Sequence, residues 1–154
     1  MKRQRGVVLL LALVLSLLLG LIAASALRDA LVETRMTGYW RNGLKALEQA
    51  EQTLLLAADP LRLVAPPVCQ PCQPPQRPHD LQGSWQGIES GFFQVQNLGT
   101  SDRVAHLPEG QQATLFRVTA VSRQAESRHV LEAVYALSGD EVRRILWRQR
   151  LREP

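Results

Sequence analysis

Two cysteines lie three residues apart in the stretch PVCQPCQPP, where thiol chemistry is possible. Cys69 and Cys72 are the only cysteines in the chain. Outside the cytoplasmic membrane an even cysteine count favours a disulfide, which here would fasten a proline-rich segment. Alternatives are a metal site, a thioredoxin-like redox pair, or thiols that stay reduced or pair with another chain. Zinc normally takes four ligands and a redox pair opens a helix, so the nearby sequence favours neither.

The remaining side chains with catalytic potential are scattered. His79, His106 and His129 are not arranged with a serine or cysteine as a nucleophile and its base. Phosphate-binding and dinucleotide-binding glycine motifs are not found. Glu132, like the helix glutamates, is interpreted as a surface charge. We therefore expect no enzymatic activity, no catalytic residues, no metal site and no cofactor.

The charge of the chain is concentrated at its start. The formal net charge is +4, and Lys2, Arg3 and Arg5 contribute three of the positive charges. The rest of the chain is nearly neutral, which gives no electrostatic reason to expect a polyanion as the main partner. Nucleic acid binding is therefore not expected.

A long apolar segment follows these cations. Residues 7–27 are uncharged, and a helix of 21 residues spans about 30 Å, the thickness of a hydrocarbon core. The preceding cations predict a cytoplasmic N-terminus and place everything after residue 27 outside. Ala24-Ser25-Ala26 imitates a signal-peptide cleavage site, but the apolar run is longer than such signals use.

Helix-forming sequence continues beyond the apolar segment. No proline occurs before Pro60, so the pattern predicts a single helix over residues 7–58 whose second half is amphipathic. Bends are possible at Gly20, Gly38 and Gly43. Leucines at a spacing of three and four residues predict the face that packs on a sheet: Leu44, Leu47, Leu54 and Leu55.

The junction before the apolar segment resembles a prepilin-type signal. Basic residues precede Gly6, and the apolar run starts at Val7. The resemblance implies that prepilin peptidase cuts after Gly6 on the cytoplasmic side and leaves a mature chain beginning with N-methylated Val7.

The segment after the apolar half resembles the N-terminal domain of PilX-type minor pilins. That family has an acidic residue, a Met-x-Gly step, an arginine and an Ala-x-x-Ala-Glu-x-x-Leu sequence after its membrane helix. The matching positions are Glu33, Met36, Gly38, Arg41, Ala50, Glu51 and Leu54, while Leu47 stands where the family has alanine. The resemblance implies an α+β, pilin-like fold with one long N-terminal helix packed on an antiparallel sheet of three or four strands.

The apolar half differs from major pilins in one respect. Major pilins carry a glutamate at the fifth mature position, whereas this chain has Leu11 there and no acidic residue before Asp29. A buried carboxylate in lipid needs a partner, which in pilins is the N-terminal amine of a neighbouring subunit. The lack of one predicts a position at the filament tip. An ordinary membrane anchor would also prefer leucine at this depth, so the inference depends on the prepilin interpretation.

The second half of the chain is predicted to form a linker and a β domain. Seven prolines between residues 60 and 78 predict an extended linker without helix. Strands are predicted over residues 92–98, 115–123, 129–137 and 142–150. In the last one, alternation places Ile145, Trp147 and Leu151 toward the helix. It places the arginines on an exposed face, where they discourage aggregation: Arg144, Arg148, Arg150 and Arg152.

The predicted organisation is a leader (1–6), a transmembrane and assembly helix (7–27), its amphipathic continuation (28–59), a proline-rich linker (60–82) and a C-terminal β domain (83–154). We expect a minor pilin that helps to initiate type IV pilus assembly at the tip, with other minor pilins and the inner-membrane assembly platform as partners. Its expected location is the bacterial inner membrane with a periplasmic domain, and then the pilus. The alternatives are a K-type tip pseudopilin of type II secretion and an uncleaved, single-pass periplasmic ligand-binding protein; K-type proteins are longer.

Overall fold

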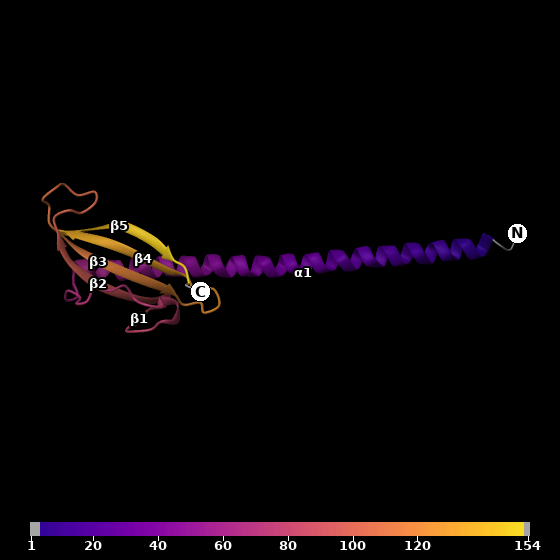
Figure 1. Ribbon diagram of the computed structural model, residues 1–154, viewed down its shortest axis with the longest axis horizontal. Coiled ribbons are helices and arrows are strands. Elements are labelled where there is room, and N and C mark those ends of the chain that lie inside the picture. Colours follow the sequence, from indigo (N-terminus) through magenta and orange to yellow (C-terminus); the bar gives the residue numbers. More distant parts are fainter. Residues whose placement is uncertain (1–3, 153–154) are drawn as a thin grey trace. The chain divides into compact units, whose positions relative to one another are not determined.

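A computed structural model of the protein describes residues 4–152 (Figure 1). Lys2 and Arg3 of the predicted leader lie outside the described residues. The chain divides into one unit that ends at Trp40 and a second unit that begins at Arg41.

Helix α1 runs without interruption over Gln4–Ala58 and contributes to both units. The predicted single helix is thus confirmed, and it does not break at Gly20, Gly38 or Gly43. It ends where predicted, because Pro60 lacks the amide hydrogen that would continue the α-helical ladder. A short 3-10 helix, η1 (Asp59–Arg62), follows directly.

The second unit contains a five-stranded antiparallel sheet in the order β1-β2-β3-β4-β5, which Figure 1 shows as a simple meander. The strands are β1 (Gln86–Gly87), β2 (Gly91–Ser101), β3 (Ala113–Ser122), β4 (Val130–Ser138) and β5 (Glu141–Arg150). Strands β2 to β5 confirm the four predicted strands, and the turn at Gly139 joins the last two. Strand β1 was not predicted, since two residues carry no alternation signal.

The main core lies between one face of this sheet and the C-terminal part of α1. We call this side of the sheet the helix face and the opposite side the outer face. Ala50 and Leu54 of α1 are buried against Phe116 of β3 and Leu131 of β4. The prediction was correct for Leu54 and for Leu47, which is partly buried.

The rest of the predicted leucine stripe was wrong. Leu44 and Leu55 are 62% and 63% exposed. Small side chains occupy the contact positions instead, namely Ala46, Ala50, Thr53 and Ala57, each at 0% exposure. They bring the helix backbone close to the sheet, which a continuous leucine stripe would prevent.

Gly91 is one point of this close approach. A Cβ atom there would lie 2.2 Å from the carbonyl oxygen of Val121 and 2.7 Å from Thr53 Oγ1. The Thr53 hydroxyl also lies 2.8 Å from Ser90 Oγ, a buried hydrogen bond that links α1 to the start of β2.

A β-bulge corrects the face assignment in β5. Tyr135 pairs with Arg144 while the adjacent Val134 pairs with Leu146, so Ile145 is the extra residue. Ile145 therefore packs on the outer face in a second cluster with Val104 and Leu107. Register places Arg144 on the helix face with Tyr135, contrary to prediction.

Beyond the bulge, residues 147 and 149 lie on the helix face, whereas Arg148 and Arg150 lie on the outer face. Trp147 is on the predicted side but is 43% exposed, and Leu151 is 79% exposed. A single inserted residue shifts the alternation that the sequence pattern assumes throughout.

Candidate functional site

The N-terminal unit presents an apolar helical surface. From Gly6 to Trp40 every residue of α1 is exposed, including Val7 at 60% and Leu11 at 56%. At Gly6 and Gly20, an added Cβ atom would meet nothing within 4 Å beyond its chain neighbours and the backbone of its own helix, so neither glycine is required by packing. Among the described residues, α1 is the one helix that is both long enough and apolar enough to cross a membrane.

The residues that resemble the PilX-type pattern lie in two environments. Glu33, Met36 and Gly38 lie on the exposed part of α1, and Arg41 is exposed as well. Ala50 and Leu54 are buried at 0% and 1% exposure, whereas Glu51 is exposed. The structure therefore does not bring these residues together. Ala50 and Leu54 serve the core, and the others are available for contacts outside the chain.

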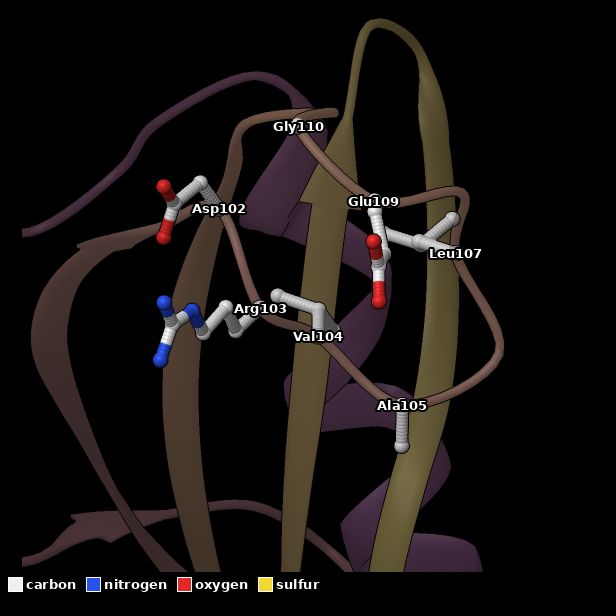
Figure 2. Close-up of a pocket in the computed structure, with 7 residues that line it drawn as sticks. All are labelled: Asp102, Arg103, Val104, Ala105, Leu107, Glu109 and Gly110. Atoms are coloured by element: carbon white, nitrogen blue, oxygen red, sulfur yellow. The ribbon is translucent and has the colours of Figure 1, made fainter.

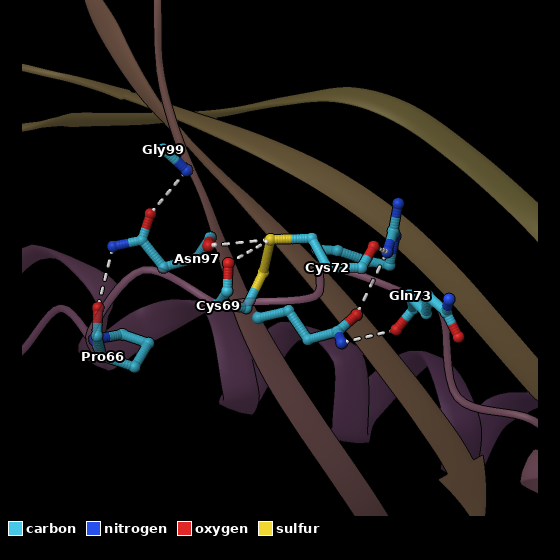
Figure 3. Close-up of a disulfide and its surroundings, with 8 residues drawn as sticks. Pro66, Cys69, Cys72, Gln73, Asn97 and Gly99 are labelled. Atoms are coloured by element: carbon cyan, nitrogen blue, oxygen red, sulfur yellow. Dashed lines mark hydrogen bonds between the residues drawn. A yellow bond between two sulfur atoms is a disulfide. The ribbon is translucent and has the colours of Figure 1, made fainter.

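The proline-rich segment carries the disulfide. Cys69 and Cys72 are joined by a disulfide bond. Val68 forms an isolated parallel bridge with Asn97 of β2, and the amide of Cys69 donates a hydrogen bond to Asn97 O at 2.9 Å. Figure 3 shows the disulfide beside β2 at this point. The dashed lines at Cys72 Sγ are close contacts with carbonyl oxygens, because oxidised sulfur has no proton to donate.

The side chain of Asn97 forms hydrogen bonds both to the proline-rich segment and to β2. It is 6% exposed, and its Nδ2 donates to Pro66 O at 2.8 Å while its Oδ1 accepts from the amide of Gly99 at 2.9 Å (Figure 3). Sequence reasoning missed this residue. Its only signal was the Asn-x-Gly step at the end of a predicted strand, which indicates a local side-chain turn and a bulge.

Residues 66–75, which we name the cysteine strap, are held across the outer face of the sheet. Gln96 of β2 donates to Gln73 O at 2.7 Å, and Arg117 of β3 donates to Cys72 O at 3.2 Å. Arg150 at the end of β5 donates to Pro75 O at 2.8 Å. Prolines leave these carbonyls without a local amide partner, and polar side chains of the sheet satisfy them.

The linker was predicted to contain no helix, and this was wrong at both ends. Pro60 lies in η1, and Pro78 begins a second 3-10 helix, η2 (Pro78–Asp80). The amide hydrogens in the first turn of a helix have no acceptor within the helix, so proline, which lacks this hydrogen, is tolerated there.

Glu132 of β4 is the buried charge at the centre of this arrangement. It is 2% exposed, which corrects its interpretation as a surface charge. Arg148 Nη2 lies 2.6 Å from its Oε1, Arg150 Nη1 lies 3.8 Å from its Oε2, and Arg117 Nε lies 4.0 Å from its Oε1. The arginines predicted to form an exposed face thus include two that neutralise a carboxylate inside the fold.

The histidines have separate environments. His79 is 9% exposed, and its pKa is lowered from 6.5 first by burial and then by the nearby charges of Arg152 and Arg150. His129 Nδ1 lies 2.8 Å from Gln149 Nε2. His106 lies in the β2–β3 loop, where its carbonyl accepts from Arg143 at 3.2 Å. Within residues 4–152 no three histidine, cysteine or acidic side chains gather as a metal site would require.

A further hollow lies in the β2–β3 loop, away from every predicted site residue. It measures about 670 Å³, and its lining includes Asp102, Val104 and Glu109, which Figure 2 shows among the labelled residues. Its only charged lining groups are two carboxylates and Arg103. The arrangement offers neither a nucleophile with its base nor a set of metal ligands.

Comparisons of the chain with protein-family models, with curated proteins and with solved structures find no match.

Proposed function

We propose that the protein is a PilX-type minor pilin that helps to initiate type IV pilus assembly. The observation that carries the proposal is the continuity of α1, whose apolar, exposed half leads without a break into the half that forms the core with the sheet. A cleavable signal peptide has no need to share a helix with the folded domain. A subunit that is held by its helix in a membrane and then in a filament needs a helix that is continuous with its folded domain.

Processing is the first step of the proposed function. Prepilin peptidase would cut after Gly6, and Val7 would become the N-methylated first residue. Both residues lie exposed on α1 in the described part of the chain. The apolar helix would then remain on the mature protein as its means of packing among neighbouring helices.

The chemistry of the helix supports a place at the tip. The fifth mature residue would be Leu11, and no carboxylate precedes Asp29. A subunit without this carboxylate cannot neutralise the terminal amine of a subunit ahead of it. Association would instead depend on burial of apolar side chains and on contacts with other minor pilins and the assembly platform.

N-terminal mass spectrometry tests the proposal most directly. We expect a chain that starts at N-methylated Val7 when the protein is expressed with prepilin peptidase. Gly6→Val should block the cut, because a branched side chain would precede the scissile bond. Gly20→Val is the matched control, and its processing should be unchanged.

Other N-termini would support other functions. An intact Met1 would indicate an uncleaved periplasmic anchor, and a start at Leu27 would indicate a secreted protein. A K-type secretion pseudopilin shares the start at Val7. Deletion of the gene would then impair protein secretion and leave piliation normal.

A further inference from the structure

A hollow with three arginines in its wall lies at one end of the second unit. It measures about 460 Å³ and is formed by residues 77–80, around η2, and residues 150–152, at the end of β5. Its wall contains Arg77, His79, Arg150 and Arg152 beside one acidic residue, Asp80. We name it the basic cleft. A second hollow of about 290 Å³ shares His79, Arg150 and Arg152 and adds Arg128, His129 and Glu126.

The positive charge of the basic cleft is only partly neutralised by the described residues. Arg152 Nη2 pairs with Asp80 Oδ1 at 2.9 Å. Arg150 donates to the carbonyl of Pro75, and Arg128 donates to the carbonyl of His79. A neutral carbonyl satisfies a hydrogen bond but does not cancel the charge of a guanidinium. The carboxylate closest to Arg150, that of Glu132, is shared with Arg117 and Arg148.

The imidazole of His79 reports this positive field. Burial lowers its pKa most, and the charges of Arg152, Arg150 and Arg128 lower it further, while Asp80 acts in the opposite direction. Cations from two parts of the chain, the end of β5 and the loop before β4, therefore converge on one buried ring. An anion in the basic cleft would neutralise part of this positive charge.

The arginines also have the geometry that phosphate recognition uses. Each guanidinium carries five N–H donors in a planar fork, and only some of them are engaged here. Several forks that approach from different chain segments can satisfy the several oxygens of one phosphate group, whereas a carboxylate offers only two oxygens.

We propose that the basic cleft binds a phosphate group, held by Arg77, Arg150 and Arg152 with His79 beside them. The phosphate can come from a soluble anion or from the headgroup of an anionic phospholipid. The proposal does not depend on the pilin assignment, because it concerns only the second unit.

The test uses the full chain, with labelled histidine, in nanodiscs of phosphatidylcholine. Inorganic phosphate is added at constant ionic strength, and the His79 ring signals are followed by NMR. We expect a saturable change at His79 and a rise in its pKa. Arg77→Gln and Arg152→Gln should each weaken the apparent affinity about five- to tenfold, since each removes a charge-assisted contact.

Arg143→Gln is the matched control. Arg143 lies near the other end of β5 and pairs with Glu141 at 2.7 Å, so its loss should leave phosphate binding unchanged. Nanodiscs that contain phosphatidylglycerol distinguish the two sources. A His79 change that needs no added phosphate and is reduced by Arg152→Gln would identify the headgroup. No saturable change in either membrane, or an equal loss with Arg143→Gln, would overturn the proposal.

Discussion

Arg148 holds Glu132 through two nitrogens of one guanidinium, with Nε 2.8 Å and Nη2 2.6 Å from the same carboxylate oxygen. Both residues lie on the outer face of the sheet, at paired positions of β5 and β4. Glu132 is buried, whereas the side chain of Arg148 is 53% exposed. The carboxylate is thus enclosed by the fold while its main partner still reaches solvent.

Glu132→Gln should destabilise the second unit by about 2 kcal/mol. The change keeps the side-chain shape but leaves Arg148, Arg150 and Arg117 without their common counter-ion. Removal of one partner from a fully buried pair costs about 3–5 kcal/mol, and the exposure of Arg148 lowers this figure. Urea-dependent proteolysis of the full chain in neutral detergent measures the decrease in the free energy of unfolding.

Glu141→Gln is the comparison for that experiment. Glu141 pairs with Arg143 at 2.7 Å, but both side chains are exposed, so the expected effect is within about 0.5 kcal/mol. Equal losses of unfolding free energy in the two variants would mean that the buried ion pair of Glu132 contributes no more to stability than the exposed pair of Glu141.

Replacement of both Cys69 and Cys72 by serine should loosen the cysteine strap and leave the sheet intact. The disulfide closes a ring between cysteines only three residues apart, so its loss should free the strap locally. Hydrogen exchange should become faster at the Cys69 amide, which is bonded to Asn97 O. Exchange at the centre of β3, around Val118, should not change; an equal acceleration there would show that the disulfide stabilises the whole domain.

Gly91→Ala should destabilise the second unit by about 3 kcal/mol or prevent its folding. The new methyl group would overlap the carbonyl oxygen of Val121 at 2.2 Å, and backbone cannot move aside as a flexible side chain can. Gly87→Ala on β1 is the matched control, because its Cβ would meet Phe92 at an ordinary 3.5 Å. Similar urea midpoints for the two variants would contradict the close approach of Gly91 to Val121 of β3 and to Thr53 of α1.

The long helix and four strands were predictable because their signals are local. Proline-free helix formers up to Pro60 and alternating apolar residues in β2 to β5 determine these elements with little help from the rest of the fold. The bulge at Ile145 was not predictable, because it depends on how β5 pairs with β4. One extra residue then reversed the expected side for Arg144.

The burial of Glu132 depends on contacts still more distant in sequence. The cysteine strap crosses the outer face through bonds from Gln96, Arg117 and Arg150 to its carbonyl groups. Proline content predicted that residues 66–75 would be extended, but no pattern indicates which face of a sheet an extended segment covers. The sequence around Glu132 therefore predicted a surface charge, because it carries no information about the position of the cysteine strap.

The stability of the second unit should fall as the pH falls below about 6.5. The folded state holds the pKa of His79 below its ordinary value of 6.5, so it favours the neutral ring. The unfolded chain binds the proton first, and the stabilisation present above pH 6.5 is lost as the pH falls through the folded-state pKa. His79→Gln should flatten this part of the profile in urea-dependent proteolysis, whereas His106→Gln should not.

Leu11→Glu tests the proposed place at the tip. The variant should still be cut after Gly6, because the new carboxylate lies beyond the cut, but it should lower the number of pili per cell. A carboxylate in the apolar helix is costly in lipid unless an amine or another partner meets it, and a subunit with no subunit ahead of it has no such partner. Leu11→Met keeps the apolar character at similar volume and should leave piliation unchanged. Normal piliation with Leu11→Glu, at normal protein levels, would remove the chemical argument for the tip, since the missing carboxylate would then have no consequence for assembly.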